Sequence, residues 1–156
     1  MTTTEDILEK ELELLKEDLI EAYDAKGMRA SGAWAEALEV EVTLNTGKIT
    51  GLKYSQQLEY GRRAGGFPPI DIIEQWIEDK GIKAIDDNIT NRTLAFLIAR
   101  KIARVGWDRQ GFGGVDLVTG IVTPQRIQSI LNKLSEGSIF TVASEITRVL
   151  TNLESA

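Results

Sequence analysis

Apolar residues recur at steps of three and four along five stretches of the chain, which predicts amphipathic helices there. The stretches cover residues 5–26, 69–80, 91–105, 124–136 and 138–153. Thr3 or Thr4 is placed to cap the first helix, and Gly27 to end it. Gly137 is expected to separate the last two helices, because glycine disfavours a helix interior.

The apolar stripes of these helices are expected to form the core. Their members are Leu8, Leu12, Leu15, Leu19 and Tyr23, then Ile70, Ile73 and Ile77, then Leu94, Ile98, Ile102 and Val105, then Ile127, Ile130, Leu131 and Leu134, then Ile139, Val142, Ala143, Ile146, Val149, Leu150 and Leu153. Small residues on the 91–105 helix, Ala95, Ala99 and Ala103, allow a neighbouring element to pack closely against it.

Alternating apolar and polar residues over 38–44 predict a strand with one buried face. The Asn45-Thr46-Gly47 turn and residues 49–54 complete an antiparallel hairpin. We therefore predict one α+β domain over residues 1–156, with a long N-terminal helix, a small antiparallel hairpin and several C-terminal amphipathic helices.

Two glycine-rich segments, about 61–69 and 107–122, are predicted to be extended loops, the second with room for a short hairpin around Thr119-Gly120. Arginine and aromatic side chains are enriched in protein interfaces, and both loops carry them. The interface hypothesis names Arg62, Arg63, Phe67, Pro68, Trp107, Arg109 and Phe112. The alternative is a plain surface turn, with Phe67 folded into the core.

The chain has no cysteine and no histidine, which excludes disulfides, thiolate chemistry and imidazole catalysis. Its glycine-rich loops lack the Lys-Ser/Thr pair of a phosphate loop, and 86–88 lacks the spacing of a calcium loop, so no cofactor or metal is expected. Neither a signal peptide nor a membrane span is expected. An enzyme that uses two convergent carboxylates stays open, because the chain has 24 acidic residues.

The net charge is −6, which disfavours a grip on nucleic acid backbone. The 91–105 helix is nevertheless locally basic. The alternative function is therefore a nucleic-acid-binding or regulatory module that uses Arg92, Arg100, Lys101, Arg104 and Arg109.

A block of motifs resembles the head–tail joining, or tail-completion (neck), proteins of tailed phages and prophages of gut bacteria. The motifs are Met28–Gly32 before the first strand, Leu58–Arg63, Gly65–Ile70, Trp76-Ile77, Lys80–Ile82, Leu94–Arg104 and Gly106. In this group an N-terminal helix precedes a strand, and a Glu-Tyr-Gly segment precedes a loop and a helix. The resemblance covers roughly residues 5–106, whereas 107–156 matches no family pattern.

The resemblance implies a structural virion protein of the portal–neck–tail axis, without enzymatic activity or cofactor. Such proteins form or join connector rings, usually of six or twelve copies. The implied partners are further copies of the chain, a portal or adaptor protein, tail proteins and, in passing, genomic DNA. The implied location is the virion, assembled in the host cytoplasm.

Overall fold

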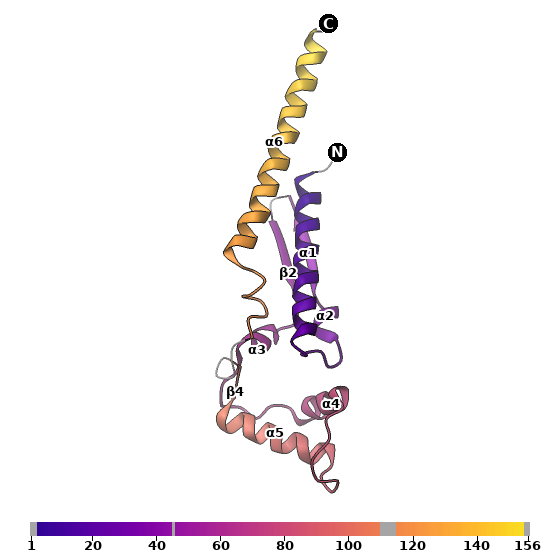
Figure 1. Cartoon of the computed structure of the whole chain (residues 1–156), viewed down its shortest axis with the longest axis vertical. Coiled ribbons are helices and arrows are strands. Elements are labelled where there is room, and N and C mark those ends of the chain that lie inside the picture. The colour runs from indigo at the N-terminus through magenta and orange to yellow at the C-terminus, as the bar shows by residue number, and fades with distance from the viewer. Residues whose placement is uncertain (1–2, 45, 110–114, 155–156) are drawn as a thin grey trace. The chain divides into compact units, whose positions relative to one another are not determined.

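The computed structural model describes residues 3–44, 46–109 and 115–154 (Figure 1). Its contacts divide the chain into two compact units. The first unit consists of the described parts of Met1–Leu19, Leu38–Thr50 and Val118–Ala156, and the second of Ile20–Ala37 and Gly51–Leu117. The expectation of a single domain stays a prediction.

Helix α1 (Thr4–Ala25) contributes to both units and follows its predicted bounds closely. Thr3 Oγ1 accepts a hydrogen bond from the Asp6 backbone N–H, and the Thr3 N–H donates to the Asp6 carboxylate at 2.7 Å. This reciprocal pair caps the helix and satisfies donors that a helix start leaves unpaired. At the other end Gly27 adopts a left-handed conformation, as expected of a helix stop.

In the first unit a hairpin of β1 (Glu39–Thr43) and β2 (Thr46–Thr50) packs against α1. The strands are antiparallel, with Val42 opposite Gly47. Gly47 lies so close to α1 that an added Cβ would meet the Leu8 side chain at 3.0 Å. The predicted hairpin is confirmed, although Leu44, placed on its buried face, is exposed.

Helix α6 (Pro124–Glu154) runs antiparallel to α1 in the same unit. Arg126 pairs with Asp18 at 2.8 Å, Lys133 pairs with the buried Glu11 at 2.7 Å, and Thr4 contacts Ser138. The Thr123 hydroxyl caps α6 by accepting from the Arg126 N–H, as predicted.

The predicted break at Gly137 is wrong, because α6 continues through this residue. The space beside Gly137 is filled by the Ile7 side chain of α1. Glycine in a helix interior is destabilising by roughly 1 kcal/mol, but here its missing side chain allows α1 and α6 to approach closely.

The second unit begins at the C-terminal end of α1. Tyr23 stacks on Trp34 of the short helix α2 (Ala33–Glu36), with ring centroids 4.7 Å apart. The Trp34 indole N–H donates to the Ser55 hydroxyl of α3 (Ser55–Tyr60) at 2.9 Å. Neither short helix was predicted, because each has too few residues to show a period.

Helices α4 (Ile70–Lys80) and α5 (Asn91–Val105) form the core of the second unit. Ile73 and Ile77 of α4 pack on Ala95 and Ala99 of α5, as the small residues of α5 predicted. Gly81 ends α4 in a left-handed conformation, and Gly106 follows α5.

The α+β fold class is confirmed, with its long N-terminal helix, small antiparallel hairpin and C-terminal helices. Several core assignments are wrong. Val105, Ile127, Leu131, Ile139, Val142 and Ala143 are exposed in the described structure. The side chains of Ile146, Val149, Leu150 and Leu153, also assigned to the core, lie outside the described residues. The suggested hairpin at Thr119-Gly120 is instead a hydrogen-bonded turn, in which Ile121 and Val122 donate to the Val118 carbonyl.

No helix within the described ranges combines the length and the apolar character needed to cross a bilayer.

Candidate partner interface

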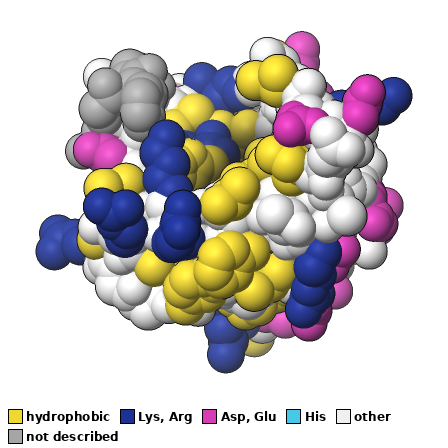
Figure 2. Space-filling view, turned by 90° about the horizontal axis from the view of Figure 1, so that it is seen from below, with side chains coloured by type: hydrophobic (Ala, Val, Ile, Leu, Met, Phe, Trp, Pro, Cys, Tyr) yellow, Lys and Arg dark blue, Asp and Glu magenta, His cyan; other side chains and the backbone are white. Residues whose placement is uncertain are grey.

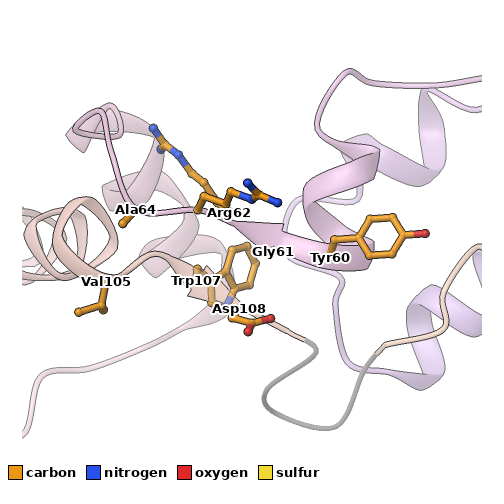
Figure 3. A pocket seen from close by; sticks show the side chains of 8 residues that line it. Tyr60, Gly61, Arg62, Ala64, Val105, Trp107 and Asp108 are labelled. Atoms are coloured by element: carbon orange, nitrogen blue, oxygen red, sulfur yellow. The ribbon is translucent and has the colours of Figure 1, made fainter.

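A two-residue ladder joins the two loops that the sequence treated separately. Strand β3 (Gly61–Arg62) pairs antiparallel with β4 (Trp107–Asp108), so that Arg62 lies opposite Trp107. The Gly65 N–H donates to the Ala103 carbonyl of α5 at 3.0 Å and holds the first loop against this helix. The ladder therefore places arginine and aromatic side chains from distant segments side by side (Figure 3).

Glycine at both ends of the ladder makes this close approach possible. Gly61 and Gly106 have φ angles of 82° and 76°, which residues other than glycine rarely adopt. A Cβ on Gly106 would lie 2.6 Å from the Arg62 carbonyl oxygen and 2.8 Å from the Ala64 nitrogen. Gly106, predicted only as a helix stop, thus also lets the backbones of two chain segments lie close together.

Arg62 and Arg109 are both held in place by neighbouring groups. The Arg62 guanidinium donates to the Gly66 carbonyl at 2.7 Å and so closes its own loop. The Arg109 guanidinium carbon lies 4.2 Å from the centroid of the Trp107 ring, in a cation–π contact. Burial lowers the pKa of Arg109 from its ordinary value.

The Arg109 Nε is buried and has no hydrogen-bond partner among the described residues. A buried donor left unpaired destabilises the protein by about 1–3 kcal/mol. Of the arginines at the ladder, Arg109 therefore has most to gain from an acceptor that a partner supplies.

A pocket of about 590 Å³ opens at the ladder. Its lining residues are Tyr60, Gly61, Arg62, Arg63, Ala64, Val105, Trp107 and Asp108. Figure 3 shows Tyr60 extending from the end of α3, while Arg62 and Trp107 project from the paired strands. The lining includes one acid, Asp108, where a hydrolytic carboxylate pair would need two. Among the described residues no three acids gather closely enough to bind a metal ion.

An aromatic pair extends the surface onto α5. The Phe67 and Phe96 rings lie 5.7 Å apart, and the Arg100 guanidinium lies 6.0 Å from the Phe96 ring. Both rings are more than two-fifths exposed, so Phe67 is not folded into the core. Phe96 was missed as a surface residue, although its position off the apolar stripe of α5 was a usable signal.

The predicted interface residues differ in how exposed they are. Arg63, Phe67 and Trp107 are exposed, and Arg62 and Arg109 are half-buried. Pro68 is buried, so its side chain does not contribute to this surface. Phe112 lies outside the described residues.

The basic helix is less basic than its composition indicates. Arg92 pairs with Asp71 and with Glu74 of α4, the latter at 3.0 Å, and these acids raise its pKa. Arg92 therefore links α5 to α4, and its charge is already paired within the subunit. Arg100, Lys101 and Arg104 remain exposed, and α5 contains no acidic residue.

Helix α1 carries the opposite charge. Five glutamates recur every four residues, at Glu5, Glu9, Glu13, Glu17 and Glu21, and all but Glu13 are exposed. Glu13 is half-exposed and pairs with Lys16 at 2.6 Å. Like charges at this spacing destabilise an isolated helix by about 0.2–0.5 kcal/mol per pair.

Helix α6 leaves a third surface uncovered. Its contacts with α1 use the side that carries Arg126, Ile130, Lys133 and Gly137. Other apolar side chains of the helix are exposed, namely Ile127, Leu131, Ile139, Phe140 and Val142. Single exposed apolar residues are ordinary, but Ile127, Leu131, Ile139 and Val142 share one side of the helix, and such a row is typical of a protein contact.

Comparison with known proteins yields no match, whether with family models, with curated proteins or with solved structures.

Proposed function

We propose that this chain is a structural virion protein of a tailed phage, a subunit of the connector between head and tail that works by binding other proteins. One observation carries the proposal. The segments that resemble neck proteins, Leu58–Ile70 and Leu94–Gly106, supply much of the exposed aromatic and arginine surface beside the ladder, whereas Trp107 and Arg109 lie outside the resemblance.

The exposure pattern supports protein binding. Phe67, Phe96 and Trp107 are each between about two-fifths and one-half exposed. Phe67 contacts Phe96, and Phe96 and Trp107 each lie beside an arginine. Rigid aromatic anchors and arginines are the residues that contribute most to protein interfaces. The exposed apolar row of α6 adds a second surface of the same character.

In this proposal the partners are further copies of the chain, a portal or adaptor protein and tail proteins, with genomic DNA in passing contact. The location is the virion. The chain needs no cofactor for this work, because binding alone is the function.

The test is to measure assembly of the full chain, alone and with the portal and tail proteins encoded in the same genome. Mass photometry and negative-stain microscopy are expected to detect an oligomer, formed by the chain alone or only on a partner. The double variant Arg63→Glu, Phe67→Ser is expected to weaken assembly, whereas the matched surface change Lys53→Glu leaves it intact. A chain that stays monomeric and ignores both partners would contradict the proposal.

A second candidate is binding of nucleic acid by α5. It is favoured by the exposure of Arg100, Lys101 and Arg104 on a helix without acids, and disfavoured by the pairing of Arg92 and by the net charge. Fluorescence anisotropy with labelled DNA at low salt distinguishes the two. Salt-dependent binding that Arg100→Ala with Arg104→Ala abolishes would favour this candidate, and absence of binding would dismiss it.

A further inference from the structure

The solvent face of α5 is a basic and aromatic ridge. It consists of Phe96, Leu97, Arg100, Lys101 and Arg104, with Phe67 stacked on Phe96. Phe96, Arg100 and Arg104 follow one another at intervals of four residues and therefore lie along one line of the helix. We call these residues of α5, together with Phe67, the α5 ridge. Figure 2 shows hydrophobic side chains beside Lys and Arg side chains on the face that it views.

The exposed acids of α1 form a ridge with the same spacing. Glu5, Glu9, Glu13 and Glu17 are four residues apart, and we call this set the α1 ridge. Glu5, Glu9 and Glu17 have no ion-pair partner among the described residues. Repulsion between neighbouring glutamates destabilises the helix, and a cationic surface that covers them would remove this destabilisation.

The two ridges are complementary in spacing and in charge. Rows of side chains four residues apart are the ridges that interdigitate in the commonest class of helix packing. Four residues correspond to about 6 Å along a helix, so Arg100 and Arg104 match the spacing of neighbouring glutamates. Leu14, which is exposed three residues before Glu17, offers an apolar contact for the Phe96 and Leu97 side.

We infer that the α5 ridge binds the α1 ridge of a second copy of this chain. The inference rests on the proposed function, which it deepens by naming the surfaces that meet. The contact joins two different surfaces, and in its head-to-tail form, with one ridge used per neighbour, it leaves one free ridge of each kind for further copies. Repetition therefore produces a ring or an open chain of copies.

Charge favours a second copy over nucleic acid as the occupant of the α5 ridge. The net charge of −6 repels a phosphate backbone, whereas the same excess of acid supplies a matching ridge on every copy. Occupancy by nucleic acid is one outcome of the test below.

The test reverses the charge of each ridge in separate full-length chains. One variant carries Arg100→Glu and Arg104→Glu, and the other carries Glu9→Lys and Glu17→Lys. All four positions are exposed, so the fold is expected to persist, and circular dichroism checks it. The single changes Arg104→Glu and Glu9→Lys are used if a double variant fails to fold. Lys83→Glu and Asp87→Lys, exposed residues outside both ridges, are the matched controls.

Assembly is measured by analytical ultracentrifugation at low salt. Each reversed variant alone is expected to assemble at least about 10-fold more weakly than the wild type, because its two ridges now repel each other. An equimolar mixture is expected to regain assembly, since each junction then joins opposite charges and the two variants alternate. Wild-type assembly is expected to weaken as salt rises.

Any of four results would overturn the inference. Reversed variants that assemble like the wild type would exclude the contact but leave the proposed function standing. A mixture that stays dissociated, or a wild type that is monomeric at low salt up to its solubility limit, would also exclude it. In the last case binding to portal or tail proteins still decides the proposed function separately. Loss of DNA binding in Arg100→Glu, Arg104→Glu without a change in assembly would assign the α5 ridge to nucleic acid.

Discussion

Replacing Gly106 with alanine tests whether the β3–β4 ladder holds the candidate interface together. The new Cβ would lie 2.6 Å from the Arg62 carbonyl oxygen, well inside the roughly 3.5 Å at which heavy atoms attract. The obstacle is backbone, which cannot rotate away as a side chain can. The φ angle of 76° adds strain of about 1–3 kcal/mol for a residue other than glycine.

Opening the ladder relieves the clash but loses backbone hydrogen bonds, each with a net contribution of about 1 kcal/mol. We therefore expect the free energy of unfolding to fall by about 2–4 kcal/mol. Urea denaturation followed by tryptophan fluorescence measures this change. Hydrogen exchange at Arg62 and Trp107 reports the ladder itself, where protection is expected to fall by about 30-fold or more.

Gly66→Ala is the matched control, because its Cβ would approach no atom more closely than 3.8 Å and its φ is not positive. It is expected to leave the free energy of unfolding within about 0.5 kcal/mol of the wild type. Equal stability and equal protection of the ladder amides in Gly106→Ala and Gly66→Ala would refute the role of Gly106.

Three further changes probe the two cores and the cap. Ile77→Ala is expected to lower the free energy of unfolding by about 2–5 kcal/mol in urea, because Ile77 is fully buried between α4 and α5; a loss below about 1 kcal/mol would contradict this packing. Hydrogen bonds from Thr3 lower the pKa of Asp6 below 3.8, so its stabilisation is present above that pH and is lost as pH falls. Asp6→Asn should therefore flatten the decline in stability between about pH 5 and pH 3, and an unchanged profile would count against the cap. Lys133→Met leaves the buried Glu11 carboxylate without its cation and is expected to lower the free energy of unfolding by about 1–3 kcal/mol. Adding Glu11→Leu to the same chain should largely restore this loss. Additive losses of stability in the two variants would contradict the pairing.

Much of the fold follows from local signals. Helix α5 was predicted with its observed bounds, because the period of its apolar residues and Gly106 agree. Helix α4 and the β1–β2 hairpin were predicted for similar reasons. The signal at Gly137 was misread because a glycine that breaks a helix and one that admits a neighbouring side chain look alike in sequence.

The candidate interface was predicted only in part. Composition identified Arg62, Phe67 and Trp107 as interface candidates, but nothing local indicated that β3 pairs with β4. Two-residue strands have no period to recognise. Likewise Arg92 counted as a free cation until α4 supplied Asp71 and Glu74.

Local patterns of residues are enough to specify the helices with long periodic stripes, their caps, the hairpin and the four-residue spacing of the glutamates on α1. These properties depend on neighbours within one or two turns of the chain. Packing in three dimensions determines which glycines lie against another backbone, which arginines are neutralised and which apolar residues stay exposed. Those outcomes depend on contacts between residues far apart in the chain, and local periodicity contains no information about them.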